Sequence, residues 1–171
     1  MMAAPASIDS HSLAGKTVLI RLTLERGLPE FACAMVRKLT QNGASIVVLG
    51  GLGQPSDDIN PAYSMQRLLP EMNKACGRDV IFISESIGAG AEQGIAKLRP
   101  GDVAIMENLR FHRSRKQNAR TFAMQLSVLG DYFIDAGGIP EREDGWQQWL
   151  ATMLPTPPAH FLTDIELTKG N

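Results

Sequence analysis

Residues 101–112 read GDVAIMENLRFH, a short apolar run that changes abruptly into charged and amide side chains. The run at 102–106 predicts a β-strand, and its apolar residues do not alternate with polar ones. Such a run is typical of a parallel strand that helices cover on both faces. Glu107, Asn108 and Arg110 follow at its carboxyl end, where open parallel sheets bind their ligands.

Similar apolar runs recur along the chain, separated by stretches with apolar residues at helical spacing. The predicted strands, including a weaker sixth, are Thr17 to Leu22, Ser45 to Leu49, Val80 to Ser84, Asp102 to Met106, Tyr132 to Ile134 and His160 to Thr163. The predicted helices are Pro29 to Asn42, Ser64 to Cys76, Ala89 to Leu98 and Asn118 to Leu129. This alternation indicates βαβ crossovers. We therefore predict an α/β fold with three α/β/α layers, Rossmann-like, and a mostly parallel sheet of about six strands.

Local signals mark the ends of these helices. Ser64 and Asn118 are candidate N-caps, and Gly43, Gly77 and Gly130 stand where C-caps are expected. Pro70 lies inside the second predicted helix, where an interior proline costs about 3 kcal/mol. That helix is therefore expected to start late or to be kinked.

Length and composition restrict the function. The chain has 171 residues, 44% of them hydrophobic and 20% charged, which suits one globular domain over residues 1–171, with 1–15 flexible. The net charge is −1, so no global field attracts nucleic acid or an anionic membrane. Neither a signal peptide nor a bilayer-spanning run is evident, and we expect a cytoplasmic protein.

The sequence does not favour metal, redox or nucleophilic chemistry. Cys33 and Cys76 are isolated in apolar or helical surroundings, and we interpret them as buried thiols. The histidines lack metal spacing and no Ser-His-Asp arrangement is evident, so we predict no metal ligand and no catalytic residue. Asp131 and Asp135 flank a predicted strand, a pattern more typical of strand ends than of an acid–base pair.

Two features are candidates for phosphate binding. The glycines at 50–53 follow a strand, but Pro55 and a polar stretch follow them instead of a helix, which favours a turn over a dinucleotide loop. A basic cluster follows the fourth long strand and either holds a polyanion or is solvated. Its members are Arg110, His112, Arg113, Arg115, Lys116 and Arg120.

The order of residues at 101–111, with Gly-Asp-Val followed by Glu-Asn-Leu-Arg-Phe, resembles the phosphoglycerate kinase family. The resemblance covers about residues 16 to 167, with supporting matches at Lys16 to Arg21, Gly43 to Leu49, Leu52-Gly53, Tyr63 to Gly77, Ile87-Gly88, Leu98 to Val103 and Asp135-Ala136. It implies the N-terminal half of that kinase, a parallel sheet that binds 3-phosphoglycerate or 1,3-bisphosphoglycerate through a basic patch. The half that binds the magnesium nucleotide would begin where this chain stops. We therefore expect no ATP, ADP or magnesium cofactor in this chain.

The resemblance also indicates which substrate contacts are retained. Arg110 and Arg142 remain as candidate phosphate ligands with Gly53, while Arg21 serves the family largely in internal ion pairing. At the other positions this chain differs from the family that it resembles. Thr23 and Glu25 stand in place of an Asp and an Asn, and Leu28 stands in place of an Arg. Gly50, Gly51 and Gln54 stand in place of a Ser, a His and an Arg, and Glu141 stands in place of a His. Losing about five contacts of roughly 1.5 kcal/mol each weakens binding by about five orders of magnitude. We expect 3-phosphoglycerate to bind in the millimolar range or not at all.

Phosphoryl transfer needs donor and acceptor held in line between two closing halves. We therefore favour a non-catalytic relative of the N-terminal domain, inactive alone, with at most a weak anion site for a phosphorylated small molecule. Two alternatives stay open: a half-enzyme completed by a separate nucleotide-binding domain, and a module that binds another protein or a second copy. Trp146 and Trp149 are candidate anchors for such a module, although packing against the sheet is the commoner role of such a pair.

Overall fold

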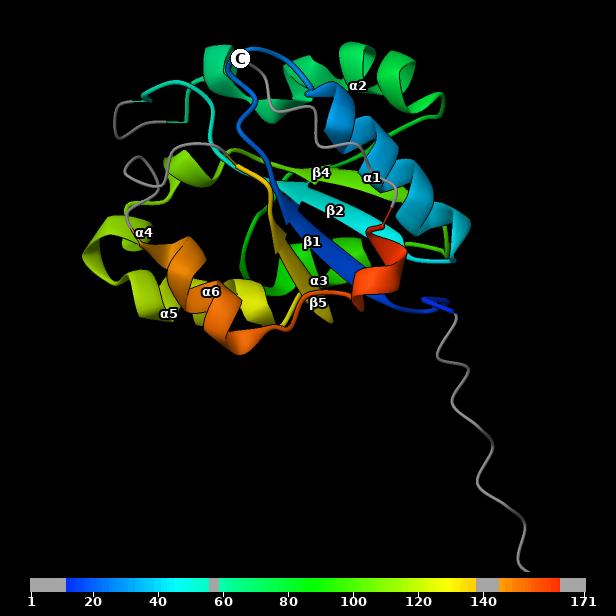
Figure 1. Cartoon of the computed structure of the whole chain (residues 1–171). Coiled ribbons are helices and arrows are strands. Elements are labelled where there is room, and N and C mark those ends of the chain that lie inside the picture. The colour runs from blue at the N-terminus through cyan, green and yellow to red at the C-terminus, as the bar shows by residue number, and fades with distance from the viewer. Residues whose placement is uncertain (1–11, 56–58, 138–144, 164–171) are drawn as a thin grey trace, which may run out of the picture.

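The computed structural model describes residues 12–55, 59–137 and 145–163 of the chain. In this part, five strands form one sheet in the order β3-β4-β2-β1-β5, and every pairing is parallel (Figure 1). The strands are β1 (Thr17–Arg21), β2 (Ser45–Leu49), β3 (Ile81–Ile83), β4 (Val103–Met106) and β5 (Tyr132–Asp135). The predicted parallel α/β fold is confirmed.

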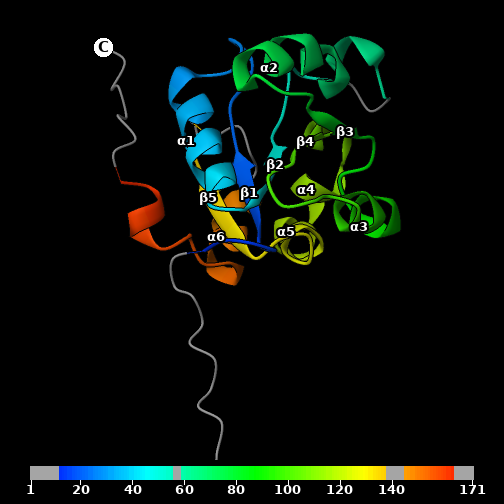
Figure 2. The same cartoon turned by 90° about the vertical axis from the view of Figure 1, so that its right-hand side faces the viewer.

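Helices cover both faces of the sheet (Figure 2). The α-helices are α1 (Glu30–Gln41), α2 (Leu69–Cys76), α3 (Gly88–Ala96), α4 (Ser114–Gln117), α5 (Ala119–Ser127) and α6 (Trp146–Met153). Short 3₁₀-helices are η1 (Pro61–Tyr63), η2 (Met65–Leu68), η3 (Leu109–Phe111) and η5 (Ala159–Phe161). Crossovers between parallel strands are right-handed, so the face on which a helix lies depends on the direction in which the chain crosses the sheet. The chain crosses from β1 toward the edge strand β3 with α1 and α2 on one face. It then crosses back to β5 with α3 and α5 on the other face, where α6 also packs.

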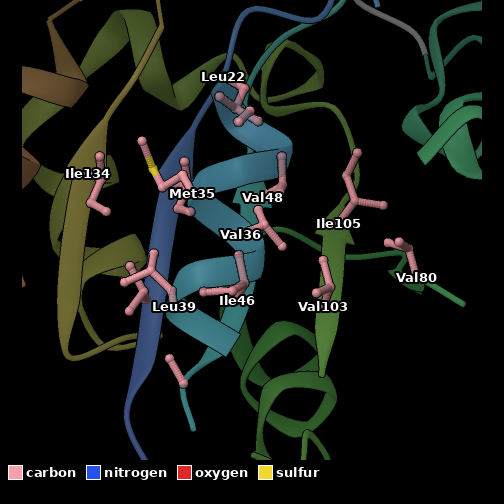
Figure 3. Packing of buried hydrophobic residues seen from close by; sticks show 14 of the residues in the cluster. Leu22, Met35, Val36, Leu39, Ile46, Val48, Val80, Val103, Ile105 and Ile134 are labelled. Atoms are coloured by element: carbon pink, nitrogen blue, oxygen red, sulfur yellow. The ribbon is translucent and has the colours of Figure 1, made fainter. Parts of the chain in front are cut away.

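The first core lies between the sheet and α1, and Figure 3 shows its packing. Val36 and Leu39 of α1 lie beside Ile46 of β2 in this cluster, and Val103 lies on the neighbouring β4. Each of these side chains is buried, and burial of such a side chain contributes about 1.5–3 kcal/mol.

The second core covers the opposite face of the same strands. Val47 and Phe133 pack there with Phe122 of α5 and with Trp146 and Leu150 of α6. Successive strand residues point to opposite faces. Both sets are buried, which is why the strand segments carry no polar alternation.

The predicted helix ends are confirmed in most places. The side chains of Ser64 and Asn118 cap η2 and α5, and Gly43 and Gly77 have φ of +89° and +65°. The helix with Pro70 starts late: the 3₁₀-helix η2 precedes α2, and the proline occupies its first turn, where no backbone N–H is needed.

Gly130 was predicted as a C-cap, but it is not among the glycines with positive φ in the described residues. An added Cβ there would lie 2.7 Å from Leu19 Cγ, so close packing on β1 requires the glycine instead.

The predicted sixth strand at 160–163 is wrong. Residues 159–161 form η5, and Phe161 packs its ring into the first core with 3% of its surface exposed. Prolines at 155, 157 and 158 precede it, and a proline has no N–H to donate to a sheet.

Residues 1–11 of the segment predicted to be flexible, 1–15, lie outside the described residues, and residues 12–15 are described. Leu13 is buried, and its backbone N donates to Asn42 O at 2.8 Å. The packed part of the chain therefore includes Leu13, earlier than the predicted boundary at residue 15.

Candidate functional site

Three loops meet at the carboxyl edge of the sheet. They follow β1 at 22–25, β2 at 50–54 and β4 at 107–110, and these three strands are neighbours in the sheet. A backbone hydrogen bond from Leu109 N to Gly50 O, 3.0 Å long, joins two of the loops. This is the edge where an open parallel sheet presents a ligand site.

Glu107 binds a neighbouring segment of its own chain. Its Oε2 accepts from Ser64 Oγ at 2.7 Å, and its Oε1 accepts from the backbone N of Met65 at 2.9 Å. Its Oε1 also accepts from Asn108 N at 2.8 Å, and its backbone O accepts from Ser86 Oγ at 2.7 Å. The carboxylate thus provides a partner for the Met65 N–H at the start of η2, which has no partner within the helix.

Asn108 is fully buried, and its amide uses every hydrogen-bonding position. Oδ1 accepts from the backbone N of Leu52 at 3.2 Å and of Arg110 at 3.0 Å. Nδ2 donates to the backbone O of Leu52 at 2.8 Å and of Tyr63 at 2.9 Å. The side chain joins the loop after β2 to the loop after β4 and sets the start of η3.

Arg110 extends from η3 across to the loops after β1 and β2. One Nη donates to Glu25 Oε1 at 2.7 Å and to the backbone O of Gly53 at 2.7 Å. The Arg110 side chain is 6% exposed and that of Glu25 is 27% exposed. A charge-assisted bond in this half-buried position is stronger than one in open water.

Two glycines make room for this arrangement. An added Cβ at Gly51 would overlap the Arg110 side chain, so the Arg110 position depends on the absence of a side chain there. Gly53 has φ of +63°, and an added Cβ would overlap the ring of Tyr63. Residues 50–53 thus form an irregular loop around Arg110 with a bend at Gly53, and the turn that the sequence favoured is not found there.

Arg21 lies at the end of β1 and forms an internal ion pair. Its Nε donates to Asp135 Oδ1 at 2.7 Å, and the Arg21 side chain is 1% exposed. Asp135 is its register partner on β5. An added Cβ at Gly137 would lie 2.5 Å from Arg21 Cζ, so the backbone packs directly on the guanidinium. Arg21 is therefore buried beneath the edge of the sheet.

The remaining candidates for acid–base, redox or metal chemistry have structural contacts. Asp131 accepts from Thr17 N at 2.9 Å, which agrees with a strand-end role. Cys33 and Cys76 are partly exposed, so the prediction of buried thiols is wrong. The partial burial of each thiol raises its pKa. Within the described ranges, no group of three or more His, Cys, Asp or Glu side chains is placed to hold a metal ion.

A family model described as phosphoglycerate kinase matches residues 8–156. This chain belongs to the phosphoglycerate kinase family. The phosphoglycerate kinase of Sphingopyxis alaskensis is 33% identical over 158 residues, which cover 86% of this chain and 40% of that protein. The cytosolic phosphoglycerate kinase of Nicotiana tabacum is 30% identical over 173 residues, or 94% of this chain and 43% of that protein.

A solved structure supports the fold. The phosphoglycerate kinase of Pyrococcus horikoshii matches 76% of this chain and 36% of its own chain, with a TM-score of 0.62 and 23% sequence identity. This chain spans about two fifths of the length of the curated relatives named above. The resemblance to an N-terminal phosphoglycerate kinase domain is thus confirmed.

The positions that the sequence predicts to have changed have different environments in the structure. Glu25 reaches Arg110, whereas Leu28 packs against the first core and Gln54 is exposed. Thr23 is partly buried in the loop after β1. Arg142 and Glu141 lie outside the described residues, so the predicted pairing of Arg110 with Arg142 stays a prediction.

The two tryptophans differ in environment. Trp146 is fully buried on α6 and meets Phe122 edge to face, with ring centroids 6.1 Å apart. Trp149 is 44% exposed, and the Arg120 guanidinium lies 5.7 Å from its ring centroid. Trp146 therefore packs in the second core, which is the commoner role predicted for such a tryptophan pair.

The sequence did not reveal that Glu25 is the partner of Arg110. In the sequence, Glu25 stands out only as a changed position of the resemblance, because the order of β1, β2 and β4 in the sheet comes from the tertiary structure. A carboxylate and a guanidinium at the carboxyl ends of two strands were the available signal.

None of the helices in the described part of the chain has the length and apolar character that crossing a bilayer requires.

Proposed function

We propose that this chain is a phosphoglycerate kinase N-terminal domain whose own side chains fill its inherited substrate pocket. By itself it is a non-catalytic member of a family that serves glycolytic phosphoryl transfer, with at most a weak anion site. We place it in the cytoplasm, as the name of the cytosolic Nicotiana tabacum relative suggests. The observation that carries the proposal is the contact of Arg110 with Glu25 and the backbone O of Gly53.

The energetics of this contact argue against tight substrate binding. A phosphate that reaches Arg110 must displace or approach the Glu25 carboxylate, and both groups are anionic. Arg21 offers no ready replacement, because it is 1% exposed and bonded to Asp135. The guanidinium groups of Arg110 and Arg21 therefore form ion pairs within the fold, and a ligand would have to compete with the Glu25 and Asp135 carboxylates for them.

Calorimetric titration with 3-phosphoglycerate is expected to give no saturation at micromolar ligand, because the loops lack most of the charged contacts of the family. Coupled-assay turnover with 1,3-bisphosphoglycerate and Mg-ADP is expected to stay at the blank rate for this chain alone. Micromolar saturation or measurable turnover would refute the proposal.

Glu25→Gln is expected to strengthen 3-phosphoglycerate binding by about tenfold, because it removes a carboxylate from Arg110 while keeping a similar side-chain length. Chemical-shift titration of backbone amides in the loops at 22–25 and 107–110 measures the change in the millimolar range. Glu92→Gln, an exposed site on α3, is the matched control for the lost charge. Equal affinity in the Glu25 variant and the control would show that Glu25 does not obstruct the pocket.

A further inference from the structure

The two cysteines of the chain lie on neighbouring helices that cover the same face of the sheet. Cys33 is in α1, and Cys76 is the last residue of α2. In both views of the molecule, α2 lies beside the N-terminal part of α1 (Figure 1 and Figure 2). Cα atoms of the two helices come within 8 Å of each other. The fold therefore brings the two helices that carry the thiols into direct contact.

Cys33 lies on the flank of α1 that faces α2. Val36 follows it by three positions, on the same side of the helix, and is buried in the first core. Phe31 and Met35 are on the other flank, where they line a cavity with Ile134 of β5. The strand β5 forms one edge of the sheet, and α2 leads to β3 at the opposite edge. The flank of α1 away from β5, which carries Cys33, is therefore the flank toward α2.

Cys76 lies on the side of α2 that faces the core. Leu69 and Met72 precede it by seven and four positions, on the same stripe of the helix. Met72 is buried, and Leu69 and Cys76 pack against the first core. A hydrogen bond also ties the two helices: Leu28 N, just before α1, donates to Glu71 Oε1 of α2 at 3.2 Å. Both thiols therefore lie at the contact between α1 and α2.

The two thiols also share one electrostatic environment. Burial is the main cause that raises the pKa of Cys76, and the charge of an ionised Cys33 raises it further. The Arg37 guanidinium opposes these effects in both thiols. Such coupling acts between groups that are close together, because salt and water screen charges at longer range. Each cysteine is partly exposed, so a small reagent reaches it from solvent.

We propose that Cys33 and Cys76 form a reversible intrachain disulfide that ties α1 to α2 when the chain meets a low-molecular-weight disulfide. The bond needs Cα atoms about 4–7 Å apart, a separation that direct contact between two helices permits. Disulfides of this kind in the cytoplasm are transient and redox-sensing, because thiols there are otherwise kept reduced. Neither cysteine lies in the loops of the candidate site, so this inference does not rest on the proposed function.

The reaction is a thiol–disulfide exchange in two steps. One cysteine thiolate attacks a sulfur of the reagent, which forms a mixed disulfide and releases one reagent thiolate. The second cysteine thiolate attacks the protein sulfur of the mixed disulfide, which forms the bond between Cys33 and Cys76 and releases the second reagent thiolate. The two protons that the cysteines lose pass through water to the released thiolates. The cysteines lose two electrons in total, and the reagent gains them.

The test is incubation of the reduced full chain with oxidised glutathione, followed by alkylation of free thiols and mass spectrometry. We expect a species that is lighter by two hydrogens and has no alkylated cysteine. Trypsin cleaves after Arg26, Arg37, Lys74 and Arg78, so the bond should join the peptides 27–37 and 75–78 until dithiothreitol separates them. Glutathione adducts on both cysteines without this peptide pair, or a disulfide between two chains, would overturn the proposal.

A matched variant moves one thiol around α2. Cys76→Ala with Ala75→Cys keeps two cysteines in the chain but turns the second by about 100° about the helix axis. The crosslinked fraction at a fixed time is expected to fall by about tenfold or more, because the sulfur atom leaves the contact with α1. An equal yield in this variant would show that the bond does not depend on the contact between the helices, and would refute the proposal.

The oxidised chain is expected to keep its fold. Its circular dichroism spectrum should be unchanged, and its melting temperature should rise by about 5 °C or more, because the bond restricts the unfolded chain between positions 33 and 76. Crosslinking that occurs only in urea, or a melting temperature below that of the reduced chain, would show that the folded contact does not accommodate the bond. Either result would count against the proposal.

Discussion

Replacing Asn108 with alanine is expected to lower the free energy of unfolding by about 3–4 kcal/mol, because four backbone groups lose a buried partner. These groups are the N and O of Leu52, the O of Tyr63 and the N of Arg110. For a chain of this length the melting temperature should fall by about 10 °C. Urea denaturation followed by circular dichroism measures the change in free energy.

Two further variants separate the hydrogen bonds from general effects. Asn60→Ala removes the side-chain cap of η1 from an exposed position and should cost only about 1 kcal/mol. Asn108→Asp keeps the acceptor but loses both donors to the Leu52 and Tyr63 carbonyls, so it too should be strongly destabilised. If Asn108→Asp unfolded with the same free energy as the wild-type chain, the two hydrogen bonds that Asn108 Nδ2 donates would contribute nothing to stability.

Replacing Trp146 with alanine is expected to destabilise the chain by about 3–5 kcal/mol, because a large buried side chain leaves a cavity beside Phe122 and Leu150. Thermal unfolding followed by circular dichroism measures the loss without relying on tryptophan fluorescence.

Trp149→Ala is the matched control, since it removes the same side chain three positions further along α6. Trp149 is 44% exposed, so the cost should be about 1 kcal/mol or less, including its contact with Arg120. Equal destabilisation by both substitutions would contradict the assigned burial. The exposure of Trp149 leaves the interaction-module hypothesis open as a prediction.

Much of the fold could be predicted because its signals are local. Continuous apolar runs predicted all five described strands, and a side-chain cap or a positive-φ glycine marked several helix ends. The exceptions have tertiary causes. Residues 160–163 contain the apolar pair Phe161-Leu162, but Phe161 ends a 3₁₀-helix and is buried in the first core. The helix α6 was not predicted, although its two tryptophans have helical spacing.

The site was less predictable because its contacts join distant parts of the chain. The Glu-Asn-Leu-Arg run was expected to face a ligand, since polar groups follow a strand there. In the folded chain Glu107 and Asn108 bind residues 52–65, and Arg110 binds Glu25, which is 85 positions away. Which of several carboxylates meets an arginine depends on the order of strands in the sheet.

The family and the parallel α/β layers follow from the sequence alone, because both depend on residue type and local spacing. Only the tertiary structure decided that Arg110 and Arg21 are held by Glu25 and Asp135. The physical reason is that charge interactions depend on distance and burial, which the packing of strands and turns establishes.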